Sequence, residues 1–158
     1  MSKERALLHL EKYGLADKYR EFEVSSATVA LAAAALGCEE ARIAKTLSFA
    51  VGESAILIVT AGDVKIDNKK YRERFGTKAR MLPFEEVERL IGHAVGGVCP
   101  FGVNDGVGVY LDESLKRFDV VYPAAGGSNN AVMLTIPELE RAACPEGWVD
   151  VTRPSTQC

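Results

Sequence analysis

A single lysine stands among apolar residues at the start of a predicted strand. Lys45 follows Ile43 and Ala44 and precedes Thr46 and Leu47, so we expect its stem to be buried while its ammonium group faces a cleft. An ammonium group held in this way can bind a phosphate or a carbonyl oxygen. The alternative is a lysine that only reaches water from a strand end, and the residues alone favour this structural role.

The second candidate is a glycine-rich loop. Six glycines fall between Gly92 and Gly108, around the segment Gly96-Gly97-Val98-Cys99-Pro100-Phe101-Gly102. Glycines let the backbone approach a ligand closely, and successive amides can bind an anion or a developing oxyanion. The loop matches neither a Walker phosphate loop nor the glycine pattern of dinucleotide-binding folds. A purely structural loop is the alternative.

Two weaker candidates follow from the remaining small and nucleophilic residues. The segment 124–130, with Gly127, Ser128 and Asn129, could present amide and hydroxyl groups to a ligand, or it could be an ordinary connection. Cys99 and His93 could form a thiol hydrolase if the imidazole activated the thiolate. This reading is disfavoured, because Cys99 precedes a proline and no predicted helix begins there to lower its pKa.

The cysteines and histidines do not have the spacing of metal ligands. Cysteines occur at positions 38, 99, 144 and 158 without a Cys-x-x-Cys pair, and the two histidines stand far apart. We therefore expect neither a metal nor another cofactor. Reduced, unpaired thiols are typical of the cytosol.

Composition places the chain among globular proteins and excludes several functional classes. Its 158 residues suggest one domain, and 47% hydrophobic and 26% charged residues are near globular averages. No apolar run is long enough to span a bilayer, and the N-terminus lacks the apolar core of a signal peptide. The net charge of −3 argues against a generally basic nucleic-acid binder. We expect a cytoplasmic protein without DNA or membrane partners.

Basic residues are concentrated in one window. Seven of them lie between Lys65 and Arg80, against two acidic residues, so the rest of the chain is strongly acidic. A local basic patch can steer a polyanion to one place on an acidic protein. An ordinary solvated helix face explains the charges equally well.

The order of predicted elements favours an α+β fold. Helices are predicted at Ser2–Tyr13, from Ser25 or Ser26 to Leu36, at Asn68–Phe75, at Phe84–Ile91 and at Pro137–Ala143, and strands at Thr46–Val51, Ala55–Thr60, Val107–Leu111, Asp119–Tyr122 and Ala131–Thr135. Regular βαβ alternation is missing, so we expect a single domain with a mixed, partly barrel-like sheet flanked by helices. This domain should span residues 1–148, and residues 149–158 should form a loose tail.

Three of these features together resemble one known family. Lys45-Thr46-Leu47, the loop from Gly96 to Gly102 and the late Gly126-Gly127 turn have the order and spacing of the YbaK/EbsC family. Its members are free-standing aminoacyl-tRNA deacylases, similar to the editing domain inserted in bacterial prolyl-tRNA synthetase. The resemblance extends from about Leu7 to Ala143.

The resemblance implies a function and roles for particular residues. The family hydrolyses the ester that joins a wrong amino acid to tRNA, typically tRNA(Pro), with a positioned water and without a metal. Its lysine falls on Lys45, and its Gly-x-x-x-Pro loop falls on Gly96–Pro100. We therefore expect Lys45 and the backbone of Gly97, Val98 and Cys99 to be catalytic, and the following residues to bind substrate: Phe22, Thr46, Gly96, Pro100, Phe101, Gly127, Ser128 and Asn129.

The implied partners are a mischarged tRNA and prolyl-tRNA synthetase. Lys69, Lys70, Arg72 and Arg74 are the expected tRNA contacts. The members that act on cysteinyl-tRNA(Pro) have a tyrosine and an aspartate where this chain has Phe22 and Ala131, which argues against specificity for cysteine. The alternative function is a non-catalytic module that binds tRNA or a synthetase.

Overall fold

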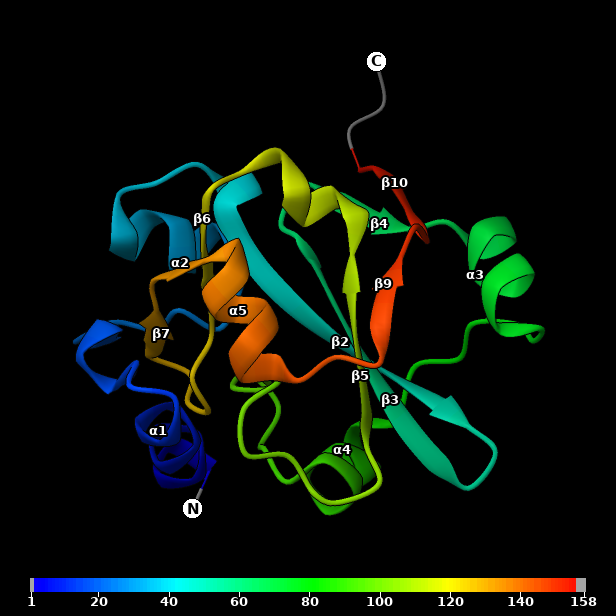
Figure 1. Ribbon diagram of the computed structural model, residues 1–158, viewed down its shortest axis with the longest axis horizontal. Helices are drawn as coiled ribbons and strands as arrows, with labels where there is room; N and C mark the ends of the chain where they lie inside the picture. The colour runs from blue at the N-terminus through cyan, green and yellow to red at the C-terminus, as the bar shows by residue number, and fades with distance from the viewer. Residues whose placement is uncertain (1, 156–158) are drawn as a thin grey trace.

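A computed structural model describes residues 2–155 and shows a curled, mixed sheet flanked by five α-helices (Figure 1). Six strands form the sheet in the order β8-β6-β2-β3-β5-β9. They are β2 (Ile43–Val51), β3 (Ser54–Ala61), β5 (Gly108–Asp112), β6 (Val120–Pro123), β8 (Leu134–Thr135) and β9 (Gly147–Val149). This half-barrel confirms the predicted α+β class with one domain.

The remaining elements surround this sheet. Two short antiparallel pairs join β1 (Tyr19–Glu21) to β7 (Asn130–Val132) and β4 (Val64–Ile66) to β10 (Thr152–Pro154). The helices are α1 (Ser2–Lys12), α2 (Val29–Leu36), α3 (Asn68–Phe75), α4 (Phe84–Ile91) and α5 (Ile136–Ala143), with 3₁₀ turns at Ala16–Lys18, Glu40–Arg42 and Glu113–Arg117. None of the helices within residues 2–155 is long and apolar enough to cross a bilayer.

Strand β3 is buried on both faces, because each face packs against an apolar cluster. Leu57 and Val59 pack into the larger cluster with residues of α1, α4 and α5. Ile56 and Ile58 point to the opposite face, where they contact a smaller cluster that contains Tyr71 of α3. Because successive side chains of a strand alternate between faces, this apolar run supplies both clusters at once.

Local capping signals set the bounds of α3 and α4. The Asp67 carboxylate accepts hydrogen bonds from the Lys69 and Lys70 amides, and Gly76 ends α3 with φ of 74°. Pro83 precedes α4, and Gly92 ends it with φ of 100°. A left-handed backbone at these stops favours glycine over any other residue. The predicted bounds of both helices are confirmed.

The predicted start of α2 is wrong. The helix begins at Val29, and its N-cap is Thr28, whose hydroxyl accepts a hydrogen bond from the Leu31 amide. Ser26 instead donates its backbone N–H to the Ser128 carbonyl over 2.7 Å. The segment before α2 is therefore held against the turn at 126–129 rather than wound into the helix.

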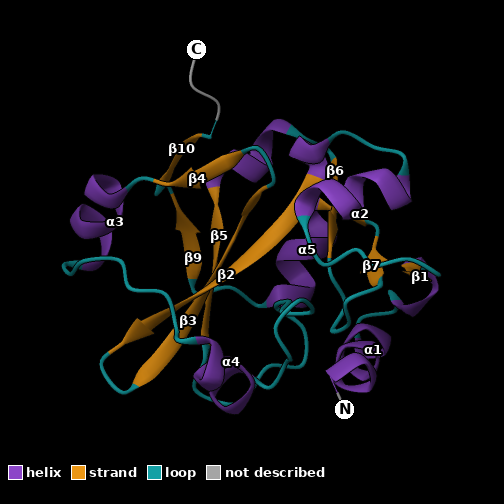
Figure 2. Cartoon of the chain, turned by 180° about the vertical axis from the view of Figure 1, so that it is seen from behind, coloured by secondary structure: helices purple, strands orange, loops and turns teal. Residues whose placement is uncertain are grey.

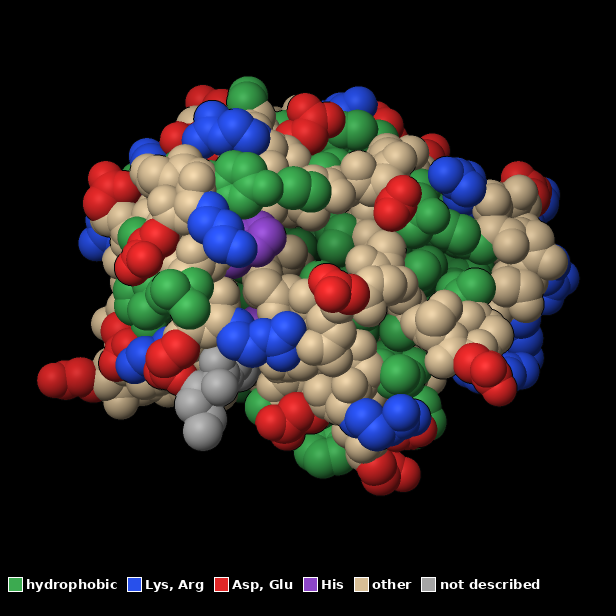
Figure 3. All heavy atoms as spheres, turned by 60° about the horizontal axis from the view of Figure 1, so that its bottom comes forward, with side chains coloured by type: hydrophobic (Ala, Val, Ile, Leu, Met, Phe, Trp, Pro, Cys, Tyr) green, Lys and Arg blue, Asp and Glu red, His purple; other side chains and the backbone are tan. Residues whose placement is uncertain are grey.

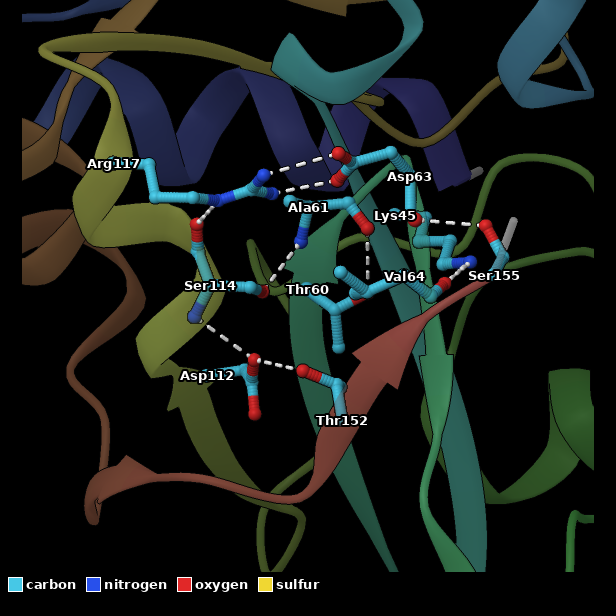
Figure 4. Close-up of polar contacts among 10 residues, drawn as sticks. All are labelled: Lys45, Thr60, Ala61, Asp63, Val64, Asp112, Ser114, Arg117, Thr152 and Ser155. Atoms are coloured by element: carbon cyan, nitrogen blue, oxygen red, sulfur yellow. Dashed lines mark hydrogen bonds and ion pairs between the residues drawn. The ribbon is translucent and has the colours of Figure 1, made fainter. Parts of the chain in front are cut away.

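The prediction of a loose tail from residue 149 is also wrong for the described part of that segment. Val149 and Val151 are buried, and β10 pairs with β4. The buried Asp112 carboxylate accepts a hydrogen bond from the Thr152 hydroxyl (Figure 4) and another from the Val151 amide. These contacts come from residues some 40 positions earlier, so local composition did not reveal them. Residues 156–158, which include Cys158, lie outside the described residues.

Candidate active site

One cavity of about 540 Å³ lies against β2. In Figure 2, β2 runs diagonally, with α2 toward the upper right and α4 at the bottom. Residues 43–48 of β2 line the cavity, together with α2 and the segment before it, the start of α4, and residues of the glycine-rich loop. A volume of this size is typical of small-ligand sites.

The lining is mostly apolar and contains no carboxylate among the described residues. Its apolar side chains include Val29, Leu82, Val87 and Ala131, and its residues with polar side-chain groups are Ser26, Thr28, Lys45, Thr46, Ser48, Tyr122 and Asn130. Met81 and Phe84 are 56% and 72% exposed at its rim. The cavity therefore offers an apolar surface with a few polar groups, and Lys45 supplies its one cationic side chain.

The Lys45 ammonium group has a fixed position. It donates a hydrogen bond to the carbonyl of Val64, the first residue of β4 after the turn from β3 (Figure 4). Burial lowers the pKa of Lys45, and the nearby Asp63 carboxylate opposes this shift. Since an ammonium group has three donors, one bond to Val64 leaves donors for a ligand.

The turn that holds Lys45 is itself anchored. The Arg117 guanidinium donates hydrogen bonds of 2.6 and 3.0 Å to the Asp63 carboxylate and thereby holds the pKa of Asp63 below its ordinary value. The Ser155 amide and hydroxyl both donate to the Asp63 carbonyl. The C-terminal segment thus helps to position the carbonyl that binds the lysine (Figure 4).

The glycine-rich loop packs directly on the turn at 126–127. A Cβ atom at Gly97 would lie 2.6 Å from the backbone carbon of Gly126 and 2.6 Å from the nitrogen of Gly127. Only a glycine permits this approach. The Asn130 side chain fixes the turn from the other side, because its Oδ1 accepts hydrogen bonds from the Ala125 and Gly127 amides, both at 3.1 Å.

Cys99 is a core residue. It is fully buried, and burial raises the pKa of its thiol to about 12. Its sulfur lies 3.5 Å from His93 Nε2, which lies 2.6 Å from the Phe101 carbonyl oxygen. Burial also lowers the pKa of His93. This environment disfavours both a thiolate and an imidazolium, so the pair does not have the character of a nucleophile and its base.

We therefore expect Cys99 to resist alkylation in the folded protein. At pH 8, iodoacetamide should modify the exposed Cys144 and leave Cys99 unmodified until urea unfolds the chain, as read by peptide mass spectrometry. Cys99→Ser should retain the activity of the unmodified protein. Rapid labelling of Cys99 in the native protein would contradict this account of the site.

The structure brings some of the predicted residues together and separates others. Lys45, Thr46, Gly96 and Val98 line the same cavity. Pro100 instead lines a second cavity of about 520 Å³, beside α1, and Phe101 is fully buried. The catalytic and binding roles of these residues stay predictions.

The remaining predicted substrate contacts lie outside the lining of the cavity. Phe22 and Asn129 hydrogen-bond to each other, with the Phe22 amide donating to the Asn129 carbonyl over 2.7 Å. Neither residue lines the cavity, nor do Gly127 and Ser128, which belong to the supporting turn. Asn130 lines the cavity and belongs to the candidate segment 124–130, whereas the sequence did not single out Thr28 and Tyr122. The types of these two residues carry no signal that could have identified them.

The predicted tRNA contacts lie on α3. Lys69, Arg72 and Arg74 are exposed, whereas Lys70 donates to Asp150 and to the Thr152 carbonyl. Figure 3 shows blue Lys and Arg side chains gathered at the right edge, the side on which α3 lies in Figure 1. The chain then runs from α3 to Met81, which lines the cavity. A basic surface and the cavity are thus joined by a short segment.

Sequence comparison finds a matching family model and several similar proteins. A model of the aminoacyl-tRNA editing domain family matches residues 23–142. The uncharacterized protein YwhH of Bacillus subtilis (strain 168) is 49% identical, and the match covers 97% of this chain and 98% of that protein. The proline–tRNA ligase of Bacillus cytotoxicus is 28% identical over 107 residues, which are 67% of this chain and 18% of the ligase.

A solved structure is similar over nearly the whole chain. It is described as "a putative trans-editing enzyme for prolyl tRNA synthetase" and is 32% identical, with a TM-score of 0.86. The match covers 96% of this chain and 97% of the solved one.

Proposed function

Because this chain belongs to the aminoacyl-tRNA editing domain family, we propose that it is a trans-editing deacylase. It would hydrolyse the ester between a wrong amino acid and the 3′-terminal adenosine of tRNA, with tRNA(Pro) as the expected tRNA. Such an enzyme is a hydrolase of carboxylic ester bonds and would act in the cytoplasm. The observation that carries the proposal is the single cavity shared by Lys45, Thr46, Gly96 and Val98.

Hydrolysis of an aminoacyl ester requires few catalytic groups from the protein. An aminoacyl ester is already activated, so a positioned water and donors aimed at the developing oxyanion can supply catalysis. Backbone groups of the loop at Gly97 and Val98 would position the water. The Lys45 ammonium would bind a phosphate or carbonyl oxygen of the acceptor end through the donors that Val64 does not use. The exposed Phe84 ring would support the terminal base, since aromatic rings stack on bases.

The names of two similar proteins support the choice of tRNA and partner. One is a proline–tRNA ligase, and the other is described as a trans-editing enzyme for prolyl tRNA synthetase. We extend this relationship to the present chain and propose that prolyl-tRNA synthetase is its partner, which would supply the mischarged tRNA.

A panel of mischarged tRNAs tests the proposal. The protein is incubated with tRNA(Pro) and with a second tRNA, each carrying several wrong amino acids, and release of the amino acid is followed. We expect release from mischarged tRNA(Pro) and little from prolyl-tRNA(Pro). Binding without turnover of any sample would support the non-catalytic module instead.

Charge reversal on α3 should separate tRNA binding from ester hydrolysis. In the double variant Lys69→Glu and Arg72→Glu, tRNA affinity should fall by at least about tenfold, and the dependence of affinity on salt should become shallower, because phosphate contacts are lost. Hydrolysis of a small aminoacyl ester should not change. Lys116→Glu, at an exposed lysine of the 3₁₀ turn after β5, is the control. Equal loss on both substrates would contradict the predicted tRNA surface.

A further inference from the structure

The outer edge of β2 has a gap that faces the cavity. β2 pairs with β3 from Ala44 to Val51, but on its other edge it pairs with β6 only at Ile43 and Ala44. The next contact on that edge comes from the segment before α4, where the Leu82 amide donates to the Ser48 carbonyl over 3.1 Å. Thr46 lies between these two contacts.

The strand geometry gives the direction of the Thr46 backbone. In an antiparallel pair, alternate residues turn both their N–H and C=O groups to the same side. Ser48 and Ala50 bond to the segment before α4, away from β3. Thr46 is two residues earlier, so its N–H and C=O groups also point away from β3, toward the edge at which the cavity lies.

The Thr46 side chain adds a third polar group. Its Oγ1 atom is buried and has no hydrogen-bond partner within the described residues. A buried polar atom without a partner is costly, and most such atoms in proteins are bonded. The gap in β2 therefore offers a ligand one amide donor and one carbonyl acceptor, and the buried Thr46 hydroxyl lies next to them.

We infer that Thr46 binds the reacting part of the substrate, and that the site requires a free α-ammonium group next to the ester. The Thr46 carbonyl would accept a hydrogen bond from the α-ammonium, and its N–H would donate to the ester carbonyl oxygen. This inference rests on the proposed function. It assigns the substrate class as esters of unblocked amino acids, as opposed to N-acylated or peptidyl esters.

The contents of the cavity favour a carbonyl as the acceptor for the ammonium. No carboxylate lines the cavity in the described part of the chain. The Asn130 amide is already engaged, since its Oδ1 accepts two backbone amides and its Nδ2 donates to Tyr19. An N-acyl group would remove the positive charge from the substrate nitrogen and add bulk at the strand edge. We therefore expect an N-acylated substrate to bind more weakly and to fit the cavity less well.

In the same arrangement, the Thr46 N–H would lie at the ester carbonyl oxygen, on which negative charge develops during hydrolysis. Water adds to the ester carbon, and the carbonyl electron pair moves to the oxygen that the Thr46 amide would contact. The bond between that carbon and the ribose oxygen then breaks, the ribose oxygen takes a proton from the added water, and the free amino acid leaves. An amide donor at the oxyanion is the kind of contact that raises kcat.

Chemically altered substrates test the ammonium contact with the unmodified protein. The aminoacyl-tRNA that is hydrolysed fastest is compared with its N-acetylated form and with its α-hydroxy form, made by deamination with nitrous acid. We expect kcat/KM, divided by the rate of uncatalysed hydrolysis of the same substrate, to fall at least about tenfold for both, since hydrogen bonds to charged groups are strong. Hydrolysis of all three at equal rates would overturn the inference.

A backbone substitution tests the amide donor. Thr46→Val is compared with the same variant in which an ester replaces the amide before position 46, which removes the N–H and also weakens the Lys45 carbonyl as an acceptor. We expect the ester to lower kcat by about 100-fold, with little change in KM. The control is an ester before position 50, which removes the bond from the Ala50 amide to the Arg80 carbonyl and should lower stability, measured by urea unfolding, but not kcat.

The outcomes separate this inference from the proposed function. If no aminoacyl-tRNA is hydrolysed, both are wrong. If hydrolysis occurs but the N-acetylated substrate and the ester variant react at the unmodified rates, only the role of Thr46 is wrong. If the ester variant does not fold, the comparison of the three substrates still decides.

Discussion

Lys45→Met is expected to lower kcat/KM for mischarged tRNA by about 100-fold, the loss expected for a charged hydrogen bond in a buried site. Methionine keeps the length and apolar character of the lysine stem, so the cavity wall should persist while the charged donor disappears. The ammonium group is held by the Val64 carbonyl, and Lys45 is a lining residue of the cavity, so the position of the ammonium group is defined before the substrate binds. Single-turnover deacylation at saturating and subsaturating enzyme separates its effect on binding from that on chemistry.

An exposed lysine provides the matched control for this variant. Lys12 lies at the end of α1, outside the lining of the main cavity, and Lys12→Met should retain activity. The account of Lys45 is contradicted if Lys45→Met is folded, as judged by circular dichroism, and still reacts within twofold of the unmodified protein.

Gly97→Ala is expected to impair both activity and stability. The added Cβ would lie 2.6 Å from backbone atoms of Gly126 and Gly127, and backbone cannot give way as a flexible side chain can. Overpacking of this kind costs about 1–3 kcal/mol of unfolding free energy. The loop must also move away from the turn, and a displacement of about 1 Å at an active site can lower the rate about 100-fold.

Gly147→Ala is the control for that substitution, because no atom lies within 4 Å of a Cβ at Gly147. Both variants are compared by urea unfolding and by deacylation. Wild-type stability and activity in Gly97→Ala would show that the loop does not depend on its contact with the turn.

The parts of the fold that local signals determine could be predicted from the sequence. Asp67 and Gly76 bound α3, Pro83 and Gly92 bound α4, and the apolar runs of the β2–β3 hairpin are continuous. The strands β1, β4, β9 and β10 were missed. Each has three residues, and each exists because a distant segment supplies its partner, as when Thr152 pairs with Ile66.

The same distinction applies to the site. The residue types singled out Lys45 and the glycine-rich loop, and the resemblance to the family grouped Lys45, Thr46, Gly96 and Val98 in one site; these four residues line one cavity. The partner of the Lys45 ammonium could not be predicted, because Val64 belongs to β4. The gap beside Thr46 was also hidden, because it depends on where β6 ends and where the segment before α4 begins to pair.

The central claim is that the cavity beside β2 binds the acylated end of tRNA. Amide NMR of the labelled protein, titrated with a non-hydrolysable 3′-aminoacylamino analogue of adenosine, tests it most directly. The claim predicts the largest shifts at residues 45–48 and at Gly96 and Val98. Shifts confined to the second cavity, around Arg5, His9 and Asn104, would contradict it.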